Sequence, residues 1–501
     1  MLNNQPPRIQ TTTMLCYTFQ MTKSNENITA HAGLAVVIDA LLAVVSSRDF
    51  HRLAQALGLR RAKTAKRQLV SAMSLVATGG EHISEIEQLR ADGGLSRLLG
   101  HVVSSATQLK DFLYRFHQTR EGEAVSGELD RQLCEQGRAQ IRPEGPALKV
   151  MEEMADAIWQ AAMGSERERE LTLEVDATIV KSNKKGSAKT YQGHRGYQPM
   201  VVYVAEKGLW VCDEFRDGNV PSNFQVLGVV AKAVGKVKPY AHKLRFRADA
   251  AFYNDKLMTY LNQSGVEFVI SAVMSTQLKQ AIVELDESEW HNMTDDDSEA
   301  DAGKSVVQWA EVTFVPDASR NRKKYGQPLR YIAVRRPVDP QLDSDDSGQL
   351  NLFADTNDTF VSNSYRYFAR VTNTDWNGAT VIGWHNRKQG HIERGHDIVK
   401  NDLAGSVMPT ARFGANAAWW RINLMVANLF SLLKWTCLPR AMRKARPKTL
   451  RFRLVNVAGR VVHHARTVVL KLASGLLLAK VLARARKLLR HLAEARAHTV
   501  C

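Results

Sequence analysis

Hydrophobic positions change their spacing at about residue 170, and this change divides the chain into two parts. Between residues 34 and 118, apolar residues recur every three or four positions, in segments separated by Gly-Gly, Asp-Gly-Gly and Ser-Ser. This spacing predicts short amphipathic helices joined by turns. The first part of the chain is therefore expected to be a small helical unit.

From residue 171 the pattern alternates between apolar and polar positions, which is typical of strands. The expected elements, in chain order, are strands at 171–180, 197–206 and 209–219, a helix at 223–237, a strand at 243–253, a helix at 254–265 and a strand at 266–273. An order of three strands followed by alternating helices and strands indicates a mixed α/β sheet.

Residues 275–362 have a different composition, with strand-like segments flanked by the acidic loops 295–303 and 339–349. A strand-like segment returns at 365–373, and helical spacing resumes from His391. We therefore expect a β-rich insertion inside an α/β unit. The 501 residues are enough for several domains with hydrophobic cores.

Positive charge is concentrated at the end of the chain. The formal net charge is +17, and the last 62 residues, from Arg440, contain sixteen Lys or Arg against one acidic residue, Glu494. Residues 476–492 have apolar positions at helical spacing and basic positions between them. A basic amphipathic helix suits nucleic acid or an anionic membrane surface, and the alternative is a solvated helical face. With this charge, the N-terminal helices suit either a helix-turn-helix DNA-binding unit or an ordinary bundle.

Several classes of protein are disfavoured. No apolar run reaches the roughly 18–20 residues that a membrane crossing needs, and the N-terminus lacks a signal-peptide pattern. The five cysteines are scattered without CxxC spacing, which argues against a disulfide framework or a zinc site. We expect a cytoplasmic protein with no membrane partner.

Two aspartates occupy matching positions in separate predicted strands. Alternation places Asp176 on one face with Thr172 and Glu174, and it places Asp249 on one face with Arg245 and Arg247. Each aspartate lies toward the C-terminal end of its strand, next to the edge where ligand sites of open α/β sheets lie. Together they suit divalent ions that act on a phosphodiester. Alternatively, each aspartate pairs with a nearby Arg or Lys.

The chain resembles the DDE transposases of bacterial insertion sequences over about residues 30–465. It is most similar to the cut-and-paste superfamily that has a β-rich insertion and a Tyr-Arg-Glu-Lys helix. The segments that carry the resemblance are "YQGHRGYQPM" (191–200), "RDGN" (216–219), "RADAAFY" (247–253), "HNRKQGHIERGHDIVKNDL" (385–403) and "FGANAAWWRINLMVANLF" (413–430).

The resemblance implies an RNase H-like catalytic core with three acidic residues. Asp176, Asp249 and Glu393 take the positions of the family's catalytic carboxylates, which bind Mg²⁺ or Mn²⁺, with two ions expected. Arg387 and Lys400 take the positions of DNA-binding residues.

The helix motif departs from the family pattern Tyr-x2-Arg-x3-Glu-x6-Lys. Trp384 replaces the tyrosine, and five residues rather than three separate Arg387 from Glu393, whereas the interval from Glu393 to Lys400 is kept. Asp397, one helical turn after Glu393, is a rival third carboxylate. The histidines of this region are not expected to be metal ligands, because carboxylates suffice for Mg²⁺.

The resemblance implies a DNA transposase that cuts transposon ends and joins them to target DNA. The expected partners are double-stranded DNA, both terminal repeats and target, and a second copy of the chain in a synaptic homodimer, with a nucleoid-associated location. The alternative is a catalytically inactive DNA-binding protein on a decayed transposase fold.

The chain is expected to divide into five parts. They are a loose segment (1–28), a helical, DNA-binding domain (29–165), an RNase H-like core in two pieces (166–274 and 365–438), a β-rich insertion (275–364) and basic C-terminal helices (439–501).

Overall fold

The computed structural model describes residues 27–117, 141–293, 307–314, 316, 329–338, 359–362, 364–464, 467–473 and 475–499. Most of the segment that the sequence predicts to be loose, and both acidic loops, 295–303 and 339–349, lie outside these residues. The fold below is that of the described residues.

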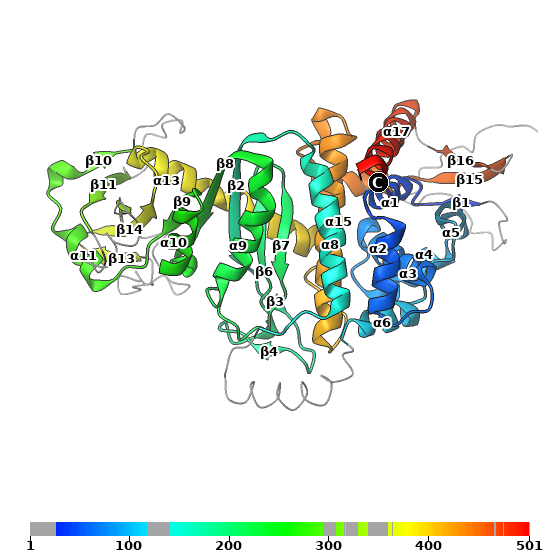
Figure 1. Ribbon diagram of the computed structural model, residues 1–501, viewed down its shortest axis with the longest axis horizontal. Coiled ribbons are helices and arrows are strands. Elements are labelled where there is room, and N and C mark those ends of the chain that lie inside the picture. Colours follow the sequence, from blue (N-terminus) through cyan, green and yellow to red (C-terminus); the bar gives the residue numbers. More distant parts are fainter. Residues whose placement is uncertain are drawn as a thin grey trace, which may run out of the picture.

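A mixed sheet of ten described strands runs through the molecule (Figure 1). Its strands are β2 (Glu168–Ala177), β6 (Met200–Val204), β7 (Leu209–Glu214), β8 (Ala241–Ala248), β9 (Glu267–Ser271), β10 (His291–Asn292), β11 (Gln308–Val312), β12 (Arg330–Pro337), β13 (Thr359–Ser362) and β14 (Tyr365–Thr372). The order is β10-β11-β12-β14-β9-β8-β2-β6-β7, and β13 also pairs with β14. β8 is parallel to β2 and to β9, and the other pairings are antiparallel. The predicted mixed α/β sheet is confirmed.

The strands of the expected insertion extend this same sheet. β14 pairs with β9 on one side and with β12 on the other, so β10–β12 lie at one end of the sheet. Figure 1 shows them at one end of the elongated molecule, beside α11 (Thr276–Val283). A small separate sheet of β3 (Val180–Lys181), β4 (Ala188–Lys189) and β5 (Arg195–Tyr197) follows β2.

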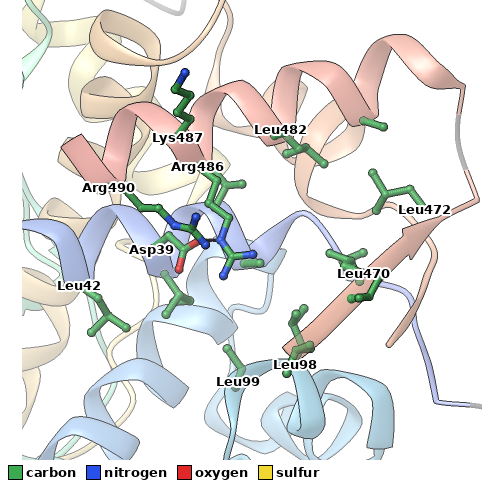
Figure 2. A pocket seen from close by; sticks show the side chains of 18 of the residues that line it. Asp39, Leu42, Leu98, Leu99, Leu470, Leu472, Leu482, Arg486, Lys487 and Arg490 are labelled. Atoms are coloured by element: carbon green, nitrogen blue, oxygen red, sulfur yellow. Dashed lines mark ion pairs between the residues drawn. The ribbon is translucent and has the colours of Figure 1, made fainter. Parts of the chain in front are cut away.

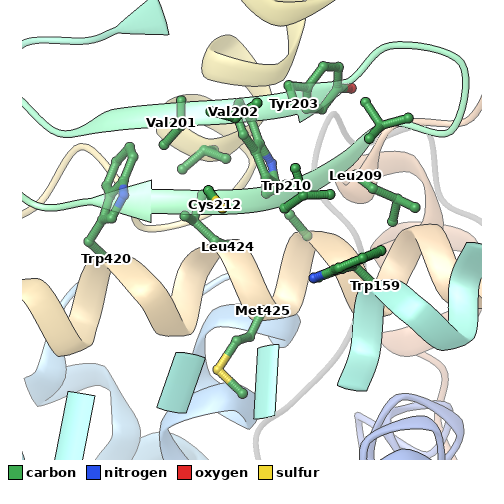
Figure 3. Packing of buried hydrophobic residues seen from close by; sticks show 14 of the residues in the cluster. Trp159, Val201, Val202, Tyr203, Leu209, Trp210, Cys212, Trp420, Leu424 and Met425 are labelled. Atoms are coloured by element: carbon green, nitrogen blue, oxygen red, sulfur yellow. The ribbon is translucent and has the colours of Figure 1, made fainter. Parts of the chain in front are cut away.

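Four helices pack near the central strands: α8 (Pro146–Met163), α9 (Val226–Val237), α10 (Asp255–Gln263) and α15 (Phe413–Thr436). Figure 3 shows Trp420, Leu424 and Trp159 packed beside the strand pair β6 and β7. α15 is buried along nearly its whole length because apolar residues occupy almost every side of it. It therefore joins the sheet to the N-terminal helices.

The predicted N-terminal helices are confirmed as α1 (Leu34–Val44), α2 (Ser47–Ala56), α3 (Ala62–Thr78), α4 (Ile86–Ala91), α5 (Gly93–Leu99) and α6 (Ala106–Arg115). Their buried faces form one continuous core with α8 and α15. Among the described residues, no helix combines the length and apolar character that a membrane crossing requires.

The basic C-terminal segment is not purely helical, which corrects the expectation from the sequence. α16 (Pro447–Leu450) is followed by a hairpin of β15 (Gly459–His464) and β16 (Thr467–Leu472), and then by α17 (Leu476–Thr499). β-branched valines at 461, 462, 468 and 469 favour strands here. β15 also pairs with β1 (Ile28–Thr29), so the start of the described chain adds a third strand to the C-terminal hairpin.

α17 packs its apolar face on α1 beside β16, around a cavity of about 920 Å³ (Figure 2). Leu482 and Leu489 are buried in this contact, and Arg486 lies 3.3 Å from Asp39 of α1. Burial raises the pKa of the Asp39 carboxyl, and the charge of Arg486 opposes this. Lys480, Arg484 and Lys487 of α17 are exposed, so the helix combines a packing face with an exposed basic face.

Candidate active site at the ends of two parallel strands

The strand register brings Asp176 and Asp249 together. β2 and β8 are parallel neighbours in which Glu174 is the register partner of Arg247. Asp176 and Asp249 each lie two residues further along, so they occupy equivalent positions. Neighbouring strands are about 4.8 Å apart, and side chains two residues apart share a face. The two carboxylates that the sequence singled out therefore lie side by side at one edge of the sheet.

Lys388 lies against this pair. It belongs to the 3₁₀ turn η5 (Arg387–Gly390), which connects α13 (Gly378–Asn386) to α14 (Ile392–Asp397). Its Nζ is 2.9 Å from Asp249 Oδ1, and its side chain is only 8% exposed. Burial lowers the pKa of Lys388, but the charges of Asp249 and Asp176 outweigh this and raise it above its ordinary value. Lys388 therefore remains a cation beside both carboxylates.

The two aspartates differ in their environments. Burial raises the pKa of Asp249, and the charge of Asp176 adds to this although Lys388 opposes it. Burial would also raise the pKa of Asp176, but His396, whose Nε2 is 3.4 Å from Asp176 Oδ2, and Lys388 outweigh it and lower the pKa. The alternative reading, that each aspartate pairs with a nearby Arg or Lys, fits Asp249, which lies beside Lys388, whereas the ion-pair contact of Asp176 is with a histidine, His396.

A buried ion pair lies one step below the aspartates on the same two strands. Glu174 is fully buried and Arg247 is 2% exposed. Arg247 Nε donates to Glu174 Oε1 at 2.7 Å, and the backbone N–H of Ile392 donates to Glu174 Oε2 at 2.9 Å. The strand pair is therefore tied directly to the first residue of α14.

Arg247 extends this connection to α13. Its guanidinium donates to the carbonyl oxygen of Trp384, lies 4.9 Å from the Trp384 ring centroid and has Nη2 2.6 Å from His391 Nδ1. In addition, His385 Nε2 is 2.9 Å from the carbonyl oxygen of Ala248, the residue before Asp249. These contacts fix the α13–η5–α14 segment against the strand ends, and they determine where Lys388 lies.

Glu393 and Asp397 both lie on α14, but neither is gathered with the two aspartates. Glu393 is exposed in the first turn. Asp397 Oδ2 lies 2.6 Å from Arg446 Nη1, and the neighbouring Asn401 side chain also donates to Asp397. Within the described parts of the chain, no group of three or more His, Cys, Asp or Glu side chains is arranged to hold a metal ion. The role of Glu393 as third ligand stays a prediction.

The two predicted DNA-binding residues lie on either side of α14. Arg387 is exposed in η5. Lys400 is half-buried in the π-helical turn η6 (Ile398–Asp402), where its Nζ donates to the carbonyl oxygen of Ile179 at 2.8 Å. Burial lowers the pKa of Lys400, and the charge of Asp176 opposes this. Lys400 is therefore close enough to the aspartate pair for its charge to act on it.

Sequence reasoning missed four residues that contribute to this site. Glu174 and Arg247 were on the correct faces, and their equal spacing from the two aspartates was a signal for a cross-strand pair. Lys388 and His396 gave no such signal, because their placement depends on how the α13–η5–α14 segment folds back onto the strands.

Residues 19–326 and 351–494 match the family described as Transposase DDE domain group 1. A search of curated protein sequences gave no match. Among solved structures, the piggyBac transposase synaptic complex with hairpin DNA aligns with 85% of this chain and 79% of that chain, at 11% identity and a TM-score of 0.43.

Proposed function

The chain belongs to the group 1 DDE transposase family, and we propose that it cuts transposon ends and joins them to target DNA by metal-dependent phosphodiester hydrolysis and strand transfer. The observation that carries the proposal is the pair Asp176 and Asp249, set at equivalent positions on adjacent parallel strands. This pair lies at the C-terminal ends of the two strands, next to the edge where α/β sheets place their ligands.

An RNase H-like core is part of the proposal. It is supported by the strand order β7-β6-β2-β8-β9, in which β2, β6 and β7 form an antiparallel unit and β8 and β9 add in parallel. We also keep the division into a helical domain (29–165), a core (166–274 and 365–438), an insertion (275–364) and a basic C-terminal segment (439–501) as a proposal.

The aspartate pair fits a divalent-ion site, because carboxylate oxygens are the hard ligands that Mg²⁺ and Mn²⁺ take. Asp176 and Asp249 would hold the metal, two ions in the family pattern, and Glu393 would complete the site from the first turn of α14. When bound, such ions activate the attacking oxygen and stabilise charge on the scissile phosphate.

The remaining residues of the site bind and orient DNA. Lys400 lies close enough to Asp176 to neutralise a phosphate at the cleavage position, and exposed Arg387 lies in the turn next to Lys388. The Glu174–Arg247 pair touches no substrate and acts by positioning α14. Geometry, rather than a nucleophilic side chain, is thus the contribution of the protein.

Double-stranded DNA is the proposed partner, at the terminal repeats and at the target. The exposed basic face of α17 supports this, because Lys and Arg that neutralise phosphates dominate DNA affinity. Since an element has two ends, we propose a homodimer in which each copy holds one end.

Cleavage of the element's own ends tests the proposal. DNA flanking the gene would be sequenced for terminal inverted repeats, and the full chain would be incubated with these repeats and Mg²⁺ or Mn²⁺. We expect strand cleavage that Asp176→Asn or Asp249→Asn lowers by orders of magnitude, whereas exposed Asp255→Asn, six residues beyond Asp249, serves as a matched control.

A protein that binds the repeats but cleaves them with neither ion would instead be an inactive DNA-binding protein on a decayed transposase fold. Near-normal cleavage by either aspartate variant would show that this aspartate has only a structural role.

A further inference from the structure

Lys388 brings a positive charge to the place where the proposed metal ions would bind. We infer that Lys388 is the resident cation of the two-aspartate site and that a divalent ion must displace it, so that Lys388 sets the metal affinity. The inference rests on the proposed function, because it takes Asp176 and Asp249 as metal ligands. It assigns to Lys388 a role that the helix motif does not include.

Lys388 is buried and contacts a carboxylate, unlike an ordinary surface lysine. Its residue is 6% exposed, and its ammonium lies 2.9 Å from Asp249 Oδ1. The turn that carries it begins directly after α13, whose last residues are pinned by the contacts of His385 with Ala248 and of Arg247 with Trp384. Both contacts involve residues close to Asp249 in the sequence, so they hold the backbone of Lys388 in place. Its four-carbon side chain can still move.

The negative charges of Asp176 and Asp249 explain why this site needs a cation. Two ionised carboxylates at adjacent, partly buried positions repel each other and are costly without a compensating positive charge. Lys388 supplies one positive charge to both. A divalent ion bound to the same oxygens would lie beside the ammonium, and the repulsion between them would drive the ammonium away. The exchange moves one cation in and one out, and no covalent bond changes.

Because a metal ion must first displace Lys388 from Asp249, the free energy of this contact is subtracted from the free energy of metal binding. A charge-assisted hydrogen bond corresponds to about ten- to a hundredfold in an equilibrium constant. Removing the ammonium while keeping the length of the side chain, in Lys388→Met, should therefore tighten Mn²⁺ binding by about this factor.

The matched control is Lys236→Met. Lys236 is also largely buried and also bridges two carboxylates, with Nζ 2.7 Å from Glu152 Oε1 and 2.8 Å from Asp156 Oδ1, but it lies on α9. Isothermal titration of the full chain with Mn²⁺ should show tighter binding for Lys388→Met and unchanged binding for Lys236→Met. Unchanged or weaker binding by a folded Lys388→Met would overturn the inference.

A second measurement needs no variant and decides the matter if Lys388→Met does not fold. The wild-type chain is treated with an amine-reactive ester with and without Mn²⁺, and labelled peptides are quantified by mass spectrometry. We expect Lys388 to be protected without Mn²⁺ and labelled with it, and Lys236 to be protected in both. If Lys388 is protected in both conditions while Mn²⁺ binds through Asp176 and Asp249, the inference about Lys388 is wrong and the proposed function still stands. If Asp176→Asn and Asp249→Asn leave Mn²⁺ binding unchanged, the proposed function fails first.

Discussion

Glu174→Gln is expected to be far more destabilising than the corresponding change in a similar ion pair on the same strands. Glu174 is fully buried, accepts hydrogen bonds from Arg247 and from the backbone of Ile392, and has His391 Nδ1 3.4 Å from its Oε1. Glutamine keeps the size and one carbonyl oxygen but removes the charge. The substitution therefore leaves a buried guanidinium without its counter-ion.

The magnitude follows from burial, and the chain supplies its own comparison. Removing one partner of a buried ion pair costs about 3–5 kcal/mol. Glu170 pairs with Arg245 between the same two strands, at 2.7 and 3.0 Å, but its side chain is 38% exposed. Exposed pairs contribute about 0–1 kcal/mol. The two substitutions should therefore differ by about 2–5 kcal/mol, a large share of the roughly 5–15 kcal/mol that stabilises a domain.

Urea unfolding of wild type, Glu174→Gln and Glu170→Gln measures this difference. The midpoint should fall clearly for Glu174→Gln and hardly at all for Glu170→Gln. Because Glu174 also holds the start of α14, the same variant should cleave DNA more slowly under conditions in which it remains folded. Equal midpoints for the two variants would refute the argument that this buried pair anchors the site.

Two further predictions concern α14 and α17. Glu393→Gln should lower DNA cleavage by orders of magnitude in an end-cleavage assay. Asp397→Asn, which weakens the contacts of this side chain with Arg446 and Asn401, should cleave at close to the wild-type rate. The opposite result would make Asp397 the third ligand. Changing the exposed residues Lys480, Arg484 and Lys487 of α17 to glutamine should reduce the slope of log K against log salt for DNA binding by about 3, one unit for each lost phosphate contact. An unchanged slope would show that this face is only a solvated surface.

The central strands could be predicted from the sequence because apolar and polar residues alternate along them. In β2, apolar Leu171, Leu173 and Val175 alternate with polar residues, and β8 follows the same rule. Alternation fixes which face each side chain occupies, so the positions of the two aspartates could be predicted before their neighbours were known. The N-terminal helices were predictable for the same reason, since their apolar residues recur at helical spacing.

The contacts that complete the site depend on tertiary packing, which local pattern does not encode. Lys388 and His396 belong to the α13–α14 segment, and only its folding back onto the strands brings them to Asp249 and Asp176. The extension of the main sheet by β10–β12 depends on pairing between β14 and β9, which are separated by about a hundred residues. The C-terminal hairpin was not predicted, because the helical spacing of apolar residues in the adjacent segment 476–492 indicated helix for the whole basic segment.

The central claim is that Asp176 and Asp249 bind the metal together with Glu393, and anomalous diffraction from crystals of the full chain soaked with Mn²⁺ tests it most directly. We predict manganese peaks within roughly 2.0–2.6 Å of carboxylate oxygens of Asp176 and Asp249, with Glu393 turned toward the same ions and Lys388 withdrawn. Manganese bound with Asp397 in place of Glu393 would contradict the assignment of the third ligand. An absence of manganese at Asp176 and Asp249 would contradict the account as a whole.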